Sequence, residues 1–248
     1  MSGDSDRPAL ILVGHGSARH PDSARPIHDL AATLRASGRF AEVTAAFMKQ
    51  APFLAPPETL VQARRVVVVP IFAGTGYYTD TLIPRAMKLD GPRTLRDGRV
   101  ILYTPPAGGH PRMPALLCRR AALAAAAAGM EPADTALILV AHGSGRPGGA
   151  GETPRRIEAA ITEMGVFAET HLVFLEQAPF ATGWRDLTPR RQVVALPLLV
   201  ARGTHASEDI PPLFQASAAD PGRRIALAAG LGEEPDLADI VLDLAGGD

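Results

Sequence analysis

The chain has 248 residues, of which 46% are hydrophobic and 21% are charged, and its formal net charge is −1. Such a composition is typical of an ordinary globular protein. The near-neutral charge argues against nucleic acid as the main partner, because binding to phosphates needs an excess of Lys and Arg on one surface. The single cysteine, Cys118, excludes both a disulfide framework and a thiolate zinc site within one chain.

The ends and apolar runs of the sequence give no sign of export or membrane insertion. The first residues, MSGDSDRP, are acidic where a secretory signal is basic, and the apolar run that follows is only LILV. A bilayer crossing needs about 18 apolar residues, and the longest candidate, ALLCRRAALAAAAAGM, contains Arg119 and Arg120. We therefore expect a cytoplasmic protein with no membrane partner.

Short apolar runs alternate with helix-like segments along the first half of the chain. The pattern predicts strands at 9–13, 43–47, 66–70 and 100–103, and helices near 22–37, 54–64, 80–88 and 112–129. Strands that are apolar throughout, without polar alternation, are expected where helices cover both faces of a parallel sheet. Crossover helices between such strands favour an α/β fold with a doubly wound, flavodoxin-like parallel sheet.

The second half of the sequence repeats the first. ALILVGHGS at 9–17 returns as ALILVAHGS at 136–144 with 8 of 9 positions identical, and FAEVTAAFMKQAPF at 40–53 aligns with FAETHLVFLEQAPF at 167–180 at the same offset of 127. Copies of this length are domain-sized. We predict two tandem domains, over 1–130 and 131–248, joined through the Gly/Pro-containing segment 124–135.

Ligands of doubly wound sheets bind beyond the carboxyl ends of the strands, and a histidine follows the first strand of each copy. These residues are His15 and His142. A single histidine at such a place is more often packed or capped than functional. In the second half, however, His205 follows the third strand, so two imidazoles are expected in one crevice, where they can hold a borderline divalent ion.

The motifs taken in order resemble a known family. LxLVxHGS opens the first strand, F(L/M)E ends the second, and P-x(5)-G-x-H-x(2)-(E/D)DIP follows the third. This set is similar to the core pattern of the class II chelatases in their long, two-repeat form, which insert cobalt or ferrous iron into sirohydrochlorin. The resemblance implies a chelatase-like fold and a lyase of cobalamin or sirohaem biosynthesis. It also implies that Co²⁺ or Fe²⁺ is a substrate and that no cofactor is permanently bound.

The resemblance also implies roles for individual residues of the second half. His142 and His205 would handle the metal, and Glu176 would assist metal capture or proton removal. The first half departs from this pattern, since Lys49 stands at the position of Glu176 and Tyr78 at that of His205. An ammonium repels a cation and a neutral phenol is a weak ligand, so we predict the working site in the second half.

Basic side chains near the HGS loops are the expected contacts to the carboxylate arms of sirohydrochlorin, because a guanidinium can bind a carboxylate through two hydrogen bonds. Any one surface arginine is more often a solvated charge. The candidates for substrate binding are Arg19, Ser144, Arg146 and Arg202.

Several alternatives stay open from sequence alone. A metal site in the first half is one of them, because His15 remains there and a tyrosinate can ligate iron. A non-catalytic carrier of metal or tetrapyrrole is the rival function, and cobalt and iron are not distinguished. The internal repeat favours a monomer that acts as a pseudo-dimer.

Overall fold

The computed structural model describes residues 7–143, 151–198, 210–215, 222–230 and 236–246. The chain forms two compact units. Unit 1 contains Met1–His110 and Pro235–Asp248, and unit 2 contains Pro111–Glu234. Among the described residues, no helix combines the length and the apolar character that a membrane crossing requires.

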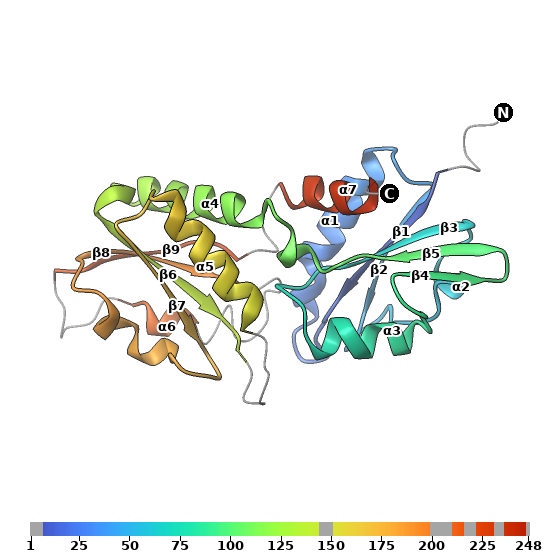
Figure 1. Ribbon diagram of the computed structural model, residues 1–248, viewed down its shortest axis with the longest axis horizontal. Helices are drawn as coiled ribbons and strands as arrows, with labels where there is room; N and C mark the ends of the chain where they lie inside the picture. Colours follow the sequence, from blue (N-terminus) through green and yellow to red (C-terminus); the bar gives the residue numbers. More distant parts are fainter. Residues whose placement is uncertain (1–6, 144–150, 199–209, 216–221, 231–235, 247–248) are drawn as a thin grey trace. The chain divides into compact units, whose positions relative to one another are not determined.

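Unit 1 is a twisted sheet covered by helices on both faces (Figure 1). Its strands have the order β2-β1-β3-β5-β4, and all pairs are parallel except β4 with β5. In Figure 1, α1 and α7 lie on one face and α3 on the other. The strands are β1 (Ala9–Gly14), β2 (Glu42–Phe47), β3 (Arg65–Pro70), β4 (Arg93–Arg96) and β5 (Arg99–Tyr103); the helical segments are η1 (Pro21–Ala24), α1 (Arg25–Ala36), α2 (Pro57–Leu60), η2 (Tyr78–Leu82), α3 (Ile83–Ala86), η3 (Ala107–Gly109) and α7 (Leu237–Gly246).

Unit 2 repeats this architecture without a counterpart of β4 among its described residues. Its sheet is parallel throughout and has the order β7-β6-β8-β9. Helices α4 and α5 lie on one face, and η5 and α6 lie on the other (Figure 1). The strands are β6 (Thr135–Ala141), β7 (Glu169–Phe174), β8 (Gln192–Pro197) and β9 (Arg224–Leu227); the helical segments are α4 (Met113–Ala127), η4 (Pro132–Asp134), α5 (Glu152–Met164), η5 (Ala181–Leu187) and α6 (Ile210–Leu213).

The predicted fold class is confirmed by these two α/β sheets. The first strand of each unit is central, and every residue of β1 and β6 is buried. Such complete burial explains why both strands are apolar throughout, with no exposed face to carry polar residues. The antiparallel strand β4 was not predicted, because its sequence RTLR is polar and only Thr94 is buried.

The helix predicted near 54–64 is wrong in extent, since α2 is a single turn. Pro57 starts this turn with a suitable backbone angle. The chain leaves the helix at Val61, and the Glu42 carboxylate then accepts hydrogen bonds from the backbone N–H groups of Gln62 and Ala63, each within 2.8 Å of Oε1. A carboxylate from β2 thus satisfies donors that a longer helix would have used.

The compact units differ from the two sequence copies in the last helix that each one contains. Helix α4 ends the first copy but belongs to unit 2, where it packs on α5 and β8. Helix α7 ends the second copy but belongs to unit 1, where it packs on α1 and β3. Each unit therefore contains the last helix of the other sequence copy. The predicted boundary at 130/131 divides the two sequence copies and stays a prediction.

This exchange predicts which unit a mutation in α7 will weaken. Ile240 is fully buried in unit 1, so Ile240→Ala should destabilise unit 1 by about 2–5 kcal/mol through lost burial and a cavity. Hydrogen exchange should show the loss of protection in β1 and β3. Trp184, the only tryptophan and fully buried in unit 2, reports the other unit by its fluorescence.

Leu117→Ala in α4 is the matched control, because Leu117 is equally buried but lies in unit 2. The two variants should weaken opposite units. If Ile240→Ala instead left β1 and β3 fully protected, α7 would not be part of unit 1.

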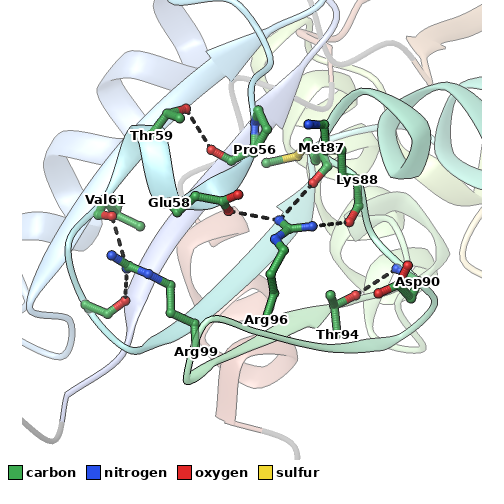
Figure 2. A network of polar contacts seen from close by, with 11 residues as sticks. Pro56, Glu58, Thr59, Val61, Met87, Lys88, Asp90, Thr94, Arg96 and Arg99 are labelled. Carbon is green, nitrogen blue, oxygen red and sulfur yellow. Dashed lines mark hydrogen bonds and ion pairs between the residues drawn. The ribbon is translucent and has the colours of Figure 1, made fainter.

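An arginine on the extra strand β4 fixes the end of α3 in unit 1 (Figure 2). The Arg96 guanidinium donates hydrogen bonds to the carbonyls of Met87 and Lys88 and contacts the Glu58 carboxylate at 2.8 Å. Helix C-termini leave carbonyls without partners inside the helix. A cation held by Glu58 therefore satisfies the end of the helical segment that begins at Tyr78.

In unit 2 an arginine at a different position in the sequence satisfies the carbonyls at the end of the corresponding helix, α6. Arg185 stands at the position of Glu58, offset by 127, and donates to the carbonyls of Leu213 and Gln215 at the end of α6. The Trp184 indole N–H also donates to Leu213, at 2.8 Å. The two units thus use arginines from unrelated sequence positions to satisfy carbonyls at the end of the corresponding helix.

The Glu58–Arg96 pair predicts an acid-sensitive contribution to the stability of unit 1. Burial raises the pKa of the Glu58 carboxyl, but hydrogen bonds from its backbone and Arg96, with the charges of Arg96 and Arg99, outweigh burial and leave this pKa below the ordinary 4.5. A carboxyl whose pKa is lower in the folded chain stabilises it above pH 4.5, and this contribution is lost as pH falls further.

We expect Glu58→Gln to lower the unfolding free energy of unit 1 by about 1–2 kcal/mol at pH 7. The difference from the unmutated protein should shrink on acidification below pH 4.5. Chemical denaturation at a series of pH values measures both effects, and a difference that grew with acid would contradict this reading.

Candidate functional site

The two HGS motifs lie at the carboxyl ends of the central strands. His15 directly follows β1 and His142 directly follows β6. In each sheet the next two strands of the chain lie on opposite sides of this central strand. The order of the strands therefore reverses at its carboxyl end, and doubly wound sheets bind ligands at such a switch point. Both histidines are therefore placed where the sequence predicted a site.

The glycine of each HGS motif is required by the backbone. Gly16 and Gly143 have positive φ angles of 67° and 78°, a left-handed conformation that residues with a Cβ rarely adopt. A Cβ on Gly16 would also lie 2.7 Å from Cγ of Gln50, and one on Gly143 would lie 2.8 Å from Cγ of Gln177. The HGS and QAPF motifs recur together because they pack on each other.

A carboxylate lies beside the imidazole in unit 2. The backbone N–H of Glu176 donates to the carbonyl of His142 at 2.9 Å, which continues the pairing of β6 and β7 beyond the strands. The Glu176 Oε2 atom lies 3.6 Å from Nδ1 of His142, and the two side chains are 52% and 41% exposed. Both groups are thus accessible to a ligand from solvent.

The surroundings of His142 favour one form of its ring. The carbonyl oxygen of Gly143 lies 3.2 Å from Nδ1, and the Glu176 carboxylate faces the same atom. Two acceptors at Nδ1 favour a proton there and leave the lone pair on Nε2, the atom that a neutral imidazole offers to a metal ion. His142 is therefore a suitable single metal ligand with a negative charge next to it.

The equivalent place in unit 1 has different chemistry. The backbone N–H of Lys49 donates to the carbonyl of His15 at 3.0 Å, so Lys49 takes the backbone position of Glu176. The Tyr78 ring contacts the His15 ring edge-on, with centroids 5.1 Å apart and planes at 84°. A solvent-exposed lysine thus stands at the backbone position where the other unit has a carboxylate, and an aromatic ring contacts the imidazole.

Several predicted site residues lie outside the described residues: His205, Ser144, Arg146 and Arg202. Arg19, the remaining arginine predicted to contact substrate, is exposed and follows the first HGS loop. Within the described part of the chain, no group of three or more His, Cys, Asp or Glu side chains could hold a metal ion. The structure thus brings together His142 and Glu176, and separately His15 and Tyr78.

Two further pairs of equivalent residues lie at these edges, and the sequence analysis did not predict their contacts. His28 lies against the Phe47 ring at 5.1 Å, and its equivalent Arg155 lies over the Phe174 ring at 5.5 Å. The offset of 127 relates both members of each contact, so the repeat itself could have identified them.

The second pair consists of Phe53 and Phe180, the last residues of the two QAPF motifs. Both side chains are unusually exposed for phenylalanine, at 61% and 52%. Each backbone is held in place by a bridge, to Phe47 and Phe174 respectively. The signal in the sequence was the QAPF motif, which repeats a phenylalanine at the offset of 127, and the structure adds that neither ring is buried.

The comparison with protein families gives one match that occurs twice along the chain. The pattern of the CbiX family matches residues 9–124 and 136–246. A curated relative from Halobacterium salinarum, described as a probable sirohydrochlorin cobaltochelatase, is 32% identical over 96% of this chain and 90% of its own length.

Two solved structures share both fold and sequence with the chain. A multi-domain protein from Deinococcus radiodurans, described as structurally similar to chelatases with two additional novel domains, has a TM-score of 0.82 and 30% identity over 97% of this chain. The chain spans only 55% of that protein. The CbiX described as the terminal enzyme of sirohaem biosynthesis in denitrifying bacteria has a TM-score of 0.71 and 26% identity, over 98% of this chain and all of its own.

Proposed function

Because the chain belongs to the CbiX family, we propose that it is a sirohydrochlorin chelatase, an enzyme that inserts a divalent metal ion into this tetrapyrrole. The His142–Glu176 pair at the carboxyl edge of the unit 2 sheet is the observation that carries the proposal. It combines a metal ligand and a carboxylate at the switch point of the fold. The proposed pathway is that of cobalamin or sirohaem.

Insertion of a metal into a tetrapyrrole requires two kinds of chemistry. The macrocycle must lose two pyrrole N–H protons, and the ion must exchange its ligands for the ring nitrogens. A neutral imidazole binds Co²⁺ or Fe²⁺ without the high affinity of a thiolate, so it can also release the ion. A positioned base contributes typically 10²–10⁴-fold to such a proton transfer.

We assign these tasks to residues of unit 2. His142 would bind the incoming ion through Nε2, with His205 as the second imidazole. Glu176 would attract the cation and accept a proton, since it stands beside His142 and is open to solvent. Arg146, Arg202 and Ser144 are the proposed contacts of unit 2 to the carboxylate arms of the macrocycle, and Arg19 is the proposed contact in unit 1.

The rival function is a non-catalytic carrier of metal or tetrapyrrole. The lysine and tyrosine in unit 1 favour it, because they show that one copy has lost the carboxylate and the second histidine of the family pattern. The pair in unit 2 keeps both a ligand and a candidate base, which a carrier does not need. We therefore favour the enzyme.

The two functions differ in the amount of product formed. Purified protein is incubated anaerobically with sirohydrochlorin and either Co²⁺ or Fe²⁺, and the visible spectrum is followed over time. Many equivalents of metallated product per chain are expected. A spectral change that stops at one equivalent would identify a carrier, and the ratio of the two rates would identify the preferred metal.

We propose that one chain is sufficient for activity, as a monomer in which the two copies form a pseudo-dimer. Sedimentation of the active protein tests this proposal. Activity confined to a species of twice the chain mass would refute it.

A further inference from the structure

We infer that unit 1 carries a second ligand site, at the carboxyl edge of its sheet, which binds a carboxylate-bearing tetrapyrrole without a metal ion. The inference rests on the proposed function for the identity of the ligand. The site is built around His15, Lys49 and the paired tyrosines Tyr77 and Tyr78.

Exposed aromatic rings gather at this edge. Tyr77 and Tyr78 are 56% and 38% exposed, and their ring centroids are 6.2 Å apart. Tyr78 also contacts the rings of His15 at 5.1 Å and Phe72 at 6.4 Å. A continuous group of rings that the fold leaves open to solvent is suited to contact a flat aromatic ligand.

The support beneath these rings is rigid. The hydroxyl of Thr79, a buried residue, accepts a hydrogen bond from the backbone N–H of Gly76 at 2.9 Å and contacts Asp80 Oδ1 at the same distance. The Tyr103 hydroxyl donates to the carbonyl of Thr79 at 2.7 Å. The segment that carries Tyr77 and Tyr78 is thus tied to the sheet at β5, so the rings are presented by a fixed backbone.

The charge at this edge suits an anion rather than a cation. Lys49 is exposed and takes the backbone position that Glu176 has in unit 2, next to the carbonyl of the HGS histidine. Its ammonium can pair with a carboxylate and repels a divalent ion. One acidic group, Asp80, lies on the same helical turn as Tyr78, but its Oδ1 contacts the hydroxyl of Thr79.

Exposed aromatic rings and an exposed lysine at the same edge of the sheet suit a flat, unsaturated ring system with acidic side chains. Sirohydrochlorin, the macrocycle that we propose as the substrate, has this chemistry. Unit 1 would therefore hold the metal-free macrocycle while unit 2 carries out the insertion. The charge at the position of Lys49 and Glu176 has reversed between the two copies, and this difference separates binding of the ring from binding of the metal.

Lys49 allows a direct test because the chain contains only one other lysine, Lys88. Metal-free sirohydrochlorin is titrated anaerobically into the full chain, and bound and free ligand are separated by equilibrium dialysis. Two equivalents per chain are expected. Lys49→Glu should weaken one of them at least tenfold, and Tyr78→Ala should weaken the same one.

Lys88→Glu is the matched control, with the same charge change on an exposed side chain of unit 1, and it should leave both equivalents unchanged. A second measurement needs no variant. A carbodiimide that activates the carboxylates of bound sirohydrochlorin should form an amide with the Lys49 amine, and peptide mapping by mass spectrometry should find the ring there and not on Lys88.

One equivalent per chain that Lys49→Glu does not affect would overturn the inference, and so would equal labelling of both lysines. Failure of the proposed function has a different signature, because the protein would then bind the macrocycle in a Lys49-dependent way without turnover. Turnover without Lys49-dependent binding would refute the second site alone.

Discussion

His142→Ala is expected to lower the turnover of metal insertion by a factor on the order of 10²–10⁴, whereas His15→Ala should lower it less than tenfold. The reason is the charge beside each imidazole. His142 has the Glu176 carboxylate 3.6 Å from its ring, while the backbone position next to His15 belongs to Lys49. Only the first arrangement attracts a divalent ion.

Initial rates with Co²⁺ and with Fe²⁺ measure this difference between the variants. Both substitutions remove a partly exposed imidazole at the same place in the fold, so each variant serves as the structural control for the other. Equal losses of turnover would refute a single working site in unit 2. A larger loss for His15→Ala would move the site to unit 1.

Glu176→Lys is expected to lower the rate of metal insertion at subsaturating metal concentration by about 10²-fold. The substitution gives unit 2 the lysine that unit 1 has at the equivalent position, Lys49. The change replaces a negative charge by a positive one close to a site for a doubly charged ion. At about 4 Å in water-like surroundings this amounts to a few kcal/mol before screening by salt. Because the Glu176 side chain is exposed, water and salt screen its charge, and the expected effect lies at the lower end of this range.

The measurement is the dependence of rate on metal concentration. Glu176→Lys should raise the apparent KM for the metal, and added salt should reduce the difference from the unmutated enzyme. Glu163→Lys makes the same charge change on an exposed residue of α5 and should have little effect. Equal effects of the two substitutions would exclude Glu176 from metal capture.

The strands and the position of the histidines were predictable because they depend on local patterns. Uninterrupted apolar runs identify β1 and β6, and the residue after a central parallel strand lies at the ligand-binding edge wherever helices cover both faces. The proximity of Glu176 to His142 could also be expected, since β7 pairs with β6 in a register that ends at Ala141 and Phe174.

The exchange of α4 and α7 between the units was not predictable, because either helix could in principle cover the sheet of its own copy. The apolar face of each helix would have the same sequence pattern whether it packed on the sheet of its own copy or on that of the other copy. The single-turn α2 was missed for a similar reason, since the carboxylate of Glu42 that satisfies the freed backbone donors comes from a strand 20 residues away. Contacts between distant segments decide both outcomes.

The arginines at the ends of α3 and α6 show how the repeat itself can mislead. The repeat indicates that equivalent positions do equivalent work, yet position 58 is Glu and position 185 is Arg. The structure reconciles them, because Arg96 from the unpredicted strand β4 makes in unit 1 the contacts that Arg185 makes in unit 2. The carbonyls of Lys88 and Gln215 are equivalent at the offset of 127, whereas the arginines that donate to them are not.

The most direct test of a metal site in unit 2 is the binding of Co²⁺ in the absence of tetrapyrrole. Equilibrium dialysis, with the visible absorption of the bound ion as a second readout, should find one Co²⁺ per chain. This ion should be lost in His142→Ala and retained in His15→Ala. Two equivalent ions per chain, or one that survives His142→Ala and disappears in His15→Ala, would contradict the assignment.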